Sequence, residues 1–268
     1  MLIRLLGTGA AEAVPALFSD TRVSDHAREH GGRNVRTRAA ALIDGCIKID
    51  LGPDTIAQVH RDQLDARDWC GLVYTHGHDD HFSPSEMQYF LHPFSAEVHM
   101  PFPIFANETI LARIRSCYPE WPMELVATKS FEAVTLADYT ITPIHANHLL
   151  EEDSHNLIFE RAGKKILYGT DTGIWLDDTW SFLPGANIDL FVVECTNGRI
   201  TSDYFGHMGI PQVVDVVDRM HKIGALSADA KIVTTHHSHN GDMTYEEIAE
   251  ACEPYGIVAG YDGLEAWV

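Results

Sequence analysis

Short apolar runs bounded by Gly, Pro, Asn or Asp recur along the whole chain. Runs of this kind are typical of buried or half-buried strands. They predict strands over residues 2–6, 39–43, 46–51, 71–74, 98–100, 131–136, 139–144, 156–160, 165–168, 188–193, 232–235 and 257–259. Asp44-Gly45, between the second and third of these runs, indicates a hairpin turn.

Helical periodicity lies between several of these runs. It predicts helices over residues 54–67, 84–92, 108–116, 210–222 and 244–253. In the first of these, Ile56, Val59 and Leu64 are expected to face the core, and Asn107 is expected to cap the third. Strands that alternate with helices over a chain of this length favour an α/β sandwich.

Residues 10–38 show neither period and are expected to form a polar loop. His26 and His30 within it share a helical spacing, which is weak support for a second metal site. The stretch is either a positively charged flap over an anionic substrate or a solvated loop, because it holds five arginines: Arg22, Arg28, Arg33, Arg36 and Arg38. Gly7-Thr8-Gly9, before it, is expected to be a structural turn rather than a phosphate loop.

Charge and cysteine content limit the partners and the compartment. Lys and Arg number 19 against 39 Asp and Glu, so the formal charge is −20, and such a surface repels nucleic acids and anionic membranes. No apolar stretch approaches the ~18 residues of a membrane span, and no signal peptide is recognisable at the start. The five cysteines show no CxxC spacing, which argues against a disulfide framework and for a reducing, cytoplasmic location. One domain, residues 1–268, is expected, and a homodimer stays open.

The densest group of polar residues is His76-Gly77-His78-Asp79-Asp80-His81. It follows the apolar run 71–74 and precedes Ser83-Pro84-Ser85-Glu86, which is typical of a helix start. Neutral imidazole and carboxylate are the usual ligands of zinc and similar divalent ions. The spacing allows two ions, with His76 and His78 directed at one and Asp80 and His81 at the other.

Other predicted strands also end in His or Asp. His148, Asp171 and His236 each follow such a run, so they are expected to point into the same cleft, with Asp171 as a bridge between two cations. Asp50, at the end of the run 46–51, is placed to hold the N–H of a ligand histidine. His207 stands just before the helix at 210, where the helix dipole disfavours an imidazolium unless an anion lies nearby.

The order of His76-x-His78-x-Asp80-His81, His148, Asp171 and His236 resembles that of the metallo-β-lactamase superfamily. The resemblance covers most of the chain and implies a four-layer αβ/βα sandwich with a dinuclear metal site at the edge between its two sheets. Residues 6–10, 235–239 and 260–265 further resemble one branch of that superfamily. This branch holds the phosphonate-pathway cyclic ribose phosphodiesterase and the tRNA 3′-processing endonuclease.

That resemblance implies a role for each residue. His76, His78 and His148 would bind one metal, Asp80, His81 and His236 would bind the second, and Asp171 would bridge the two, while His207 would act on the leaving oxygen. The cofactors implied are two divalent ions, zinc or manganese, with iron as a further option. One feature of the phosphonate enzyme is missing, since residues 19–24 hold no cysteine for the structural zinc site that a histidine like His239 completes.

A metal pair of this kind holds a bridging hydroxide that attacks phosphorus or a carbonyl carbon. Asp80 would orient the hydroxide, and His207 would protonate the departing oxygen, which a phosphodiester needs because its alkoxide leaves poorly. The expected function is therefore a phosphodiesterase for a small, anionic, cyclic or linear substrate. Three alternatives stay open: an RNA-processing endonuclease, a lactone, thioester or carboxyl-ester hydrolase in which His207 is idle, and a metal-dependent sensor without turnover.

Overall fold

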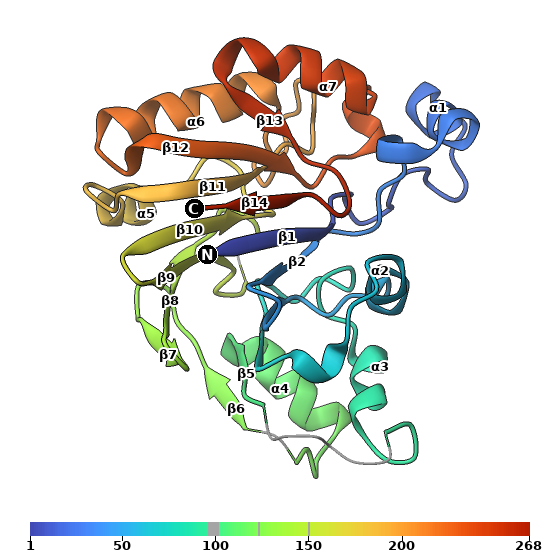
Figure 1. The fold of residues 1–268 in the computed structure, drawn as a ribbon, viewed down its shortest axis with the longest axis vertical. Coiled ribbons are helices and arrows are strands. Elements are labelled where there is room, and N and C mark those ends of the chain that lie inside the picture. The colour runs from blue at the N-terminus through green and yellow to red at the C-terminus, as the bar shows by residue number, and fades with distance from the viewer. Residues whose placement is uncertain (96–101, 123, 150) are drawn as a thin grey trace.

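Two seven-stranded sheets pack face to face, with helices on their outer faces (Figure 1). The computed structural model describes residues 1–95, 102–122, 124–149 and 151–268. The first sheet has the order β14-β1-β2-β3-β4-β5-β6, with β1 (Leu2–Gly7), β2 (Ala40–Ile43), β3 (Ile47–Ile49), β4 (Gly71–Val73), β5 (Ile104–Ala106), β6 (Leu125–Ala127) and β14 (Glu265–Trp267). The second has the order β13-β12-β11-β10-β9-β8-β7, with β7 (Val134–Leu136), β8 (Tyr139–His145), β9 (His155–Arg161), β10 (Lys164–Gly169), β11 (Ile188–Glu194), β12 (Leu226–Thr235) and β13 (Ile257–Ala259). This is the α/β sandwich that the sequence predicts.

Each sheet is partly parallel and partly antiparallel. Strands β3 to β6 run parallel in the first sheet, and β10 to β13 run parallel in the second. Strand β8 points the same way as β10, since both pair antiparallel with β9. The carboxyl ends of β8, β10, β11 and β12 therefore lie along one edge of the second sheet, and those of β3 and β4 lie together in the first.

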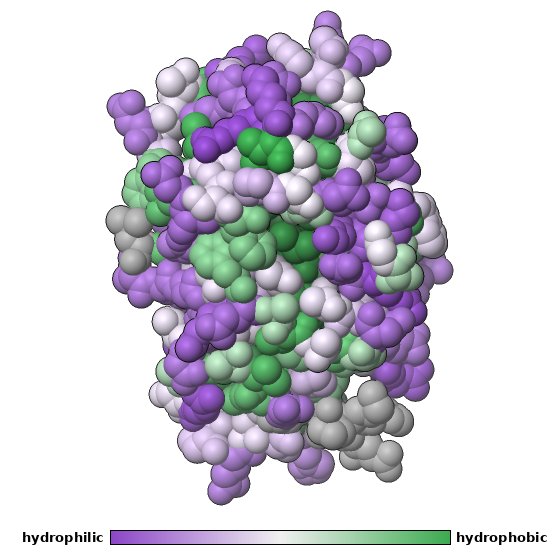
Figure 2. Space-filling view, turned by 90° about the vertical axis from the view of Figure 1, so that its left-hand side faces the viewer, coloured by the Kyte–Doolittle hydropathy of each residue, from purple (hydrophilic) through white to green (hydrophobic). Residues whose placement is uncertain are grey.

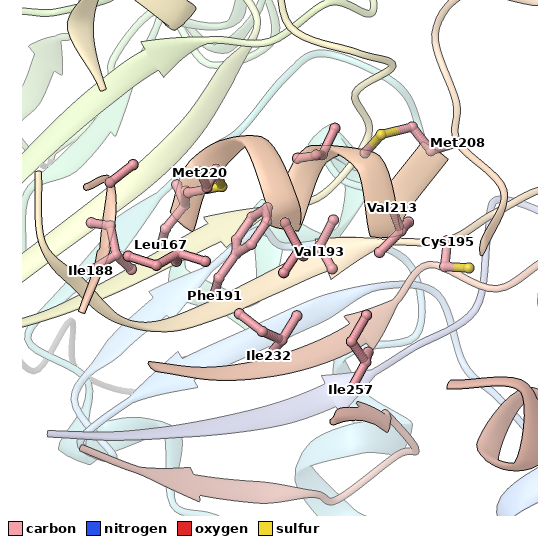
Figure 3. Close-up of a cluster of buried hydrophobic side chains, with 14 of the residues drawn as sticks. Leu167, Ile188, Phe191, Val193, Cys195, Met208, Val213, Met220, Ile232 and Ile257 are labelled. Carbon is pink, nitrogen blue, oxygen red and sulfur yellow. The ribbon is translucent and has the colours of Figure 1, made fainter. Parts of the chain in front are cut away.

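The apolar runs predicted as strands are buried on both faces where helices cover the sheet. In β11, Leu190 and Val192 pack in the layer between the two sheets, whereas Phe191 and Val193 pack beneath helix α6 (Ile210–Lys222). Figure 3 shows this second set, with Val213 and Met220 of α6 above Phe191 and Val193. Full burial of such a side chain contributes roughly 1.5–3 kcal/mol, which explains the uninterrupted apolar run Leu190–Val193 within β11.

The surface is not uniformly polar. Figure 2 shows the left-hand side of Figure 1, where hydrophobic residues gather along the middle of the face between hydrophilic margins. Trp267 near the C-terminus is 58% exposed. No helix within the described residues is long and apolar enough to cross a membrane.

Most predicted helices form, although their bounds differ. Asn107 caps α4 (Glu108–Cys117) through a bond from the N–H of Ile110, and α7 (Tyr245–Cys252) begins at a capping box of Thr244 and Glu247. The predicted helices 54–67 and 84–92 are each split into a short α-helix and a 3-10 turn. These are α2 (Thr55–Arg61) with Ala66–Asp68, and α3 (Pro84–Met87) with Gln88–Phe90.

Three expectations about elements are wrong. Residues 10–38 contain a helix, α1 (Arg22–His30), because Thr21 caps it and Val23 and Ala27 bury one narrow face. Ile56 is 45% exposed rather than in the core, since α2 turns Thr55 and Gln58 inward instead. Strands β5, β6 and β14 and helix α5 (Asp177–Phe182) are present without having been predicted, and the strand predicted at 98–100 lies outside the described residues.

The prediction that the cysteines form no disulfide is also wrong. Cys46 and Cys70 are bonded, with their Cα atoms 5.1 Å apart. They directly precede β3 and β4, which pair in parallel with Ile47 opposite Gly71, so the two side chains arrive side by side. Sheet pairing rather than a short sequence motif creates this bond, and the argument from cysteine spacing for a reducing compartment loses its support.

Candidate metal centre

The turn after β4 is held in a compact shape that directs several side chains inward. The N–H and hydroxyl of Thr75 both donate to the carboxylate of Asp50, at 2.8 and 2.9 Å. Further along, the N–H of His81 donates to the carbonyl of His78 at 3.0 Å. Helix α3 begins shortly after His81, with a proline in its first helical turn.

Three imidazoles and one carboxylate meet at the first cluster. The Nδ1 of His78 lies 3.1 Å from the Nε2 of His76 and 3.0 Å from the Nε2 of His148. Asp171 places Oδ1 3.9 Å from the Nε2 of His76 and 3.6 Å from that of His148. The structure thus brings residue 148, after β8, and residue 171, after β10, to the turn after β4.

The second cluster shares the same aspartate. The Nε2 of His81 lies 3.2 Å from Asp80 and 3.0 Å from Oδ2 of Asp171. The Nε2 of His236 lies 3.1 Å from Oδ1 of Asp171. Asp171 therefore lies between the two clusters, and all seven predicted ligand residues meet at one place.

The backbone is unusual at this place. Asp50, Asp171 and His236 all have a positive φ, at 57°, 47° and 56°, a region that residues with a Cβ seldom adopt. Asp50 and His236 directly follow β3 and β12, and Asp171 stands two residues after β10, so the backbone turns close to the end of each strand. Conformations that cost energy persist where surrounding contacts enforce them, and they gather at functional sites.

The outer nitrogen of most of these histidines is already engaged. His81 donates from Nδ1 to Asp50 at 2.7 Å, as the sequence predicts for that carboxylate. The Nδ1 of His236 lies 2.8 Å from the hydroxyl of Thr196, and that of His148 lies 3.2 Å from the carbonyl of Gly206. Such contacts fix the ring and its tautomer, and they leave the other nitrogen directed at the cluster.

The inner nitrogens fit a cation. The Nε2 atoms of His81 and His236 are buried and make no hydrogen bond of good geometry, although each lies close to a carboxylate oxygen of Asp171. Buried polar atoms are seldom left so. The chemistry of the donors agrees, because imidazole nitrogen and carboxylate oxygen suit zinc, manganese or iron. Three groups have one candidate ligand atom per residue, all within 4.8 Å of one another: His76, His78, His148 and Asp171; Asp80, His81 and His236; Asp171, His207 and His236.

Burial lowers the pKa values of these imidazole rings, whereas nearby carboxylates raise them. Burial, with His81 next in importance, lowers the pKa of His76 well below its usual value, and burial lowers the pKa of His148 to about 4. Burial would lower the pKa of His81 as well, but the carboxylates around it, Asp171 first, raise that pKa well above its usual value. Most of the cluster is thus in the neutral form that binds a cation, and the proton on His81 would leave when one binds.

His207 lies beside the clusters, and Glu194 lies behind it. The His207 ring is 5.0 Å from the ring of His148 and 5.3 Å from that of His236, centroid to centroid. Its Nδ1 lies 3.5 Å from the fully buried carboxylate of Glu194. Burial lowers the pKa of His207, but the hydrogen bond and charge of Glu194 outweigh it, so the pKa is raised. Glu194 was not among the predicted site residues, although it stands at the end of a buried strand, much as Asp50 directly follows one.

Residues 19–24, which lack the cysteines of a structural zinc site, contact His239 through hydroxyl groups instead. The Nδ1 of His239 lies 2.9 Å from the hydroxyl of Thr21 and 3.4 Å from that of Ser19. Its Nε2 lies 3.7 Å from Glu12. His26 and His30, the other weak metal candidates, stack with their ring centroids 4.1 Å apart on α1 and join none of the candidate metal groups within the described residues.

Fold and site together define a metal-dependent hydrolase of the metallo-β-lactamase type. The model of the beta-lactamase superfamily domain matches residues 46–237, and the chain belongs to this family. No curated protein sequence matches the chain.

Several solved structures share the fold over the full chain. A new diphosphatase from the PhnP family is 22% identical, with a TM-score of 0.78, over 99% of this chain and 96% of that one. Zinc-bound PqqB from Methylobacterium extorquens is 15% identical, with a TM-score of 0.78, over 100% of both chains. The short form of human tRNase Z is 18% identical, with a TM-score of 0.67, over 100% of this chain and 99% of that one. The fold neighbours thus include the branch that the sequence resembles.

Proposed function

We propose that the protein is a phosphodiesterase that uses two divalent metal ions, zinc or manganese or else iron, on a small anionic substrate. The observation that carries this proposal is the pair of His207 and Glu194 beside the ligand clusters. Hydrolysis of an activated acyl group has little need of an acid for its leaving group, whereas a phosphodiester expels a poor alkoxide.

The two clusters supply the places for the ions. His76, His78 and His148 would hold one, Asp80, His81 and His236 would hold the other, and Asp171 would contact both. When bound, such ions supply Lewis acidity, which lowers the pKa of water and neutralises charge on the substrate.

The protein's own groups place the protons. His207 would carry a proton on its Nε2 and deliver it to the departing oxygen, because Nδ1 faces Glu194. The carboxylate of Glu194 is held in position, because it also accepts hydrogen bonds from the N–H of Thr196 at 2.8 Å and the N–H of Met208 at 2.6 Å. Asp80, 9% exposed, would accept a hydrogen bond from the attacking water and orient it.

A small substrate fits the surface better than RNA. The arginines of residues 22–38 are already occupied within the protein. Arg22 binds Asp242 and Glu247, Arg28 binds Asp25, Arg38 binds Asp54, Arg33 lies against Tyr245 and Tyr261, and Arg36 is buried. With a formal charge of −20 as well, this segment offers little attraction for a polyanion, so neither a nucleic acid nor a membrane is proposed as partner.

The test is hydrolysis by purified protein with a measured metal content. Cyclic phosphates, bis-p-nitrophenyl phosphate, a methyl phosphodiester, a lactone and a precursor tRNA form the panel. We expect the small diesters to be cleaved and the precursor tRNA to stay intact. Cleavage of the lactone alone, of the tRNA alone, or of none of these would overturn the proposal.

His207→Ala is the decisive variant. It is expected to keep its metal and to lose about 10²-fold or more in turnover of the methyl diester. The loss should be smaller with bis-p-nitrophenyl phosphate, whose leaving group needs less help. His221→Ala, at an exposed histidine of α6, is the matched control.

A further inference from the structure

The segment between β11 and α6 brings apolar side chains to the surface beside the metal centre. Ile200 is 43% exposed, Tyr204 46% and Phe205 45%. The ring of Tyr204 lies 5.4 Å from the ring of His207 and 6.5 Å from that of His148, centroid to centroid. An exposed aromatic ring therefore adjoins both the proposed acid and a candidate metal ligand.

The backbone fixes the place of this ring. A Cβ at Gly206 would lie 2.8–2.9 Å from atoms of the Tyr204 ring, so the ring packs against this glycine. Phe205 is fixed as well, because a Cβ at Gly173 would lie 1.6 Å from the carbonyl oxygen of Phe205. Ile174, which follows, is 45% exposed and extends the apolar surface. The Tyr204 ring thus packs against Gly206 and lies 5.2 Å from the ring of Phe205, centroid to centroid, while nearly half of the residue stays exposed.

Two arginines near this surface are already paired with carboxylates. Arg199, at the start of the segment, binds Asp242 and Glu247, and Arg113, beside the turn after β4, binds Asp79. The phosphate of a substrate would therefore find its positive partners in the metal centre and in His207. The rest of the substrate would meet the apolar surface of Ile174, Tyr204 and Phe205.

We propose that Tyr204 is a specificity-determining residue whose ring stacks on a planar aromatic group of the substrate. This rests on the proposed function, because His207 marks the side on which the leaving oxygen lies. The aromatic group then belongs to the leaving part of the phosphodiester, as a base does in a nucleotide. Stacking of a base on an aromatic side chain is worth roughly 1–3 kcal/mol, which is about fivefold to 150-fold in affinity.

Two substrate-like probes, each a phosphate ester that lacks the second ester group, isolate the aromatic group. AMP and ribose 5-phosphate share the sugar and the phosphate and differ by the base alone. Calorimetric titration of the zinc-loaded protein should give a Kd for AMP that is about fivefold to 150-fold lower than that for ribose 5-phosphate. Equal affinities, or no measurable binding of AMP, would overturn the proposal.

Variants at Tyr204 assign the preference to its ring. Tyr204→Ala should weaken the binding of AMP and leave the binding of ribose 5-phosphate unchanged, so that the two Kd values become similar. Tyr204→Phe should keep the preference, because the ring and not the hydroxyl does the stacking. Tyr255→Ala, at a tyrosine that is 56% exposed in another part of the chain, is the control. A preference that survives in Tyr204→Ala would overturn the assignment.

The same samples separate this proposal from the proposed function. Hydrolysis of bis-p-nitrophenyl phosphate without a preference for AMP would overturn the role of Tyr204 and leave the phosphodiesterase standing. A preference for AMP without hydrolysis of any diester would overturn the phosphodiesterase and leave Tyr204 as a ligand-binding residue.

Discussion

The Nδ1 of His207 lies 3.5 Å from the Oε1 of Glu194, and that carboxylate is fully buried at the end of β11. A buried carboxylate costs free energy unless it is well bonded. Here the N–H groups of Thr196 and Met208 hold it in place. The charge of Glu194 is thus kept next to one ring, where it favours the protonated form.

The first prediction concerns pH. Because Glu194 raises the pKa of His207 against the effect of burial, the imidazolium form is present below that raised pKa and is lost as the pH rises through it. Turnover of an alkyl diester should therefore fall on the alkaline side. Glu194→Gln should move this fall to lower pH, as measured by kcat/KM against pH. An unmoved alkaline limb, with Glu253→Gln as control, would exclude this role for Glu194.

The second prediction concerns metal content. Asp171 contacts both clusters, so Asp171→Ala should lose bound metal as well as activity. Metal analysis after gel filtration measures the loss, and Asp177→Ala, at an exposed aspartate in the first turn of α5, should keep its metal. Two ions per chain in Asp171→Ala would contradict a bridging position.

The third prediction concerns Lys48, which is fully buried in β3 and donates to the carbonyls of Ile49 and Asp50. Burial lowers its pKa to about 7 in spite of the nearby charge of Asp50, whereas an unfolded lysine has a pKa of about 10.4. Between these values the unfolded chain binds more protons, so this group makes the free energy of unfolding rise with pH. The slope is at most about 1.4 kcal/mol per pH unit.

Urea denaturation at pH 7 and pH 9 measures this effect. Lys48→Met should lack that part of the slope, whereas Lys222→Met, at an exposed lysine of α6, should match the wild type. Identical slopes in all three proteins would show that the pKa of Lys48 is not lowered.

The fourth prediction concerns the bond between Cys46 and Cys70, which closes a loop between residues 24 apart. Closing a loop of this size restricts the unfolded chain and contributes roughly 3 kcal/mol. Reduction, or Cys70→Ser, should lower the melting temperature, and Cys117→Ser, at an exposed free cysteine, should not. Thiol titration of the unreduced, unfolded protein should find three thiols, from Cys117, Cys195 and Cys252; five would contradict the bond.

Much of the site could be predicted because ligands at the ends of parallel strands meet at one edge of a sheet. His236 and Asp171 were recognisable in this way, since His236 directly follows the run that forms β12 and Asp171 stands two residues after β10. Glu194 carried the same signal and could have been found. Tyr204 could not, because its relation to His207 depends on the fold of a segment without regular structure.

The features that could not be predicted from the sequence depend mostly on contacts between distant parts of the chain. Strand β14 has no apolar alternation of its own and forms because it pairs with β1. The bond between Cys46 and Cys70 depends on the alignment of β3 with β4. Helix α1 escaped prediction because its buried face consists of few residues among many charges. In each case the decisive contact is made with a distant part of the chain.

The candidate ligands come from both sheets: the turn after β4 belongs to the first, whereas Asp171 and His236 follow strands of the second. An ion held at this boundary ties together halves of the chain that otherwise touch mainly through apolar side chains. Its binding free energy then adds to the resistance of the whole sandwich to separation, in proportion to the logarithm of its concentration. Loss of the ion would therefore lower the stability of the contact between the two sheets as well as stop the reaction.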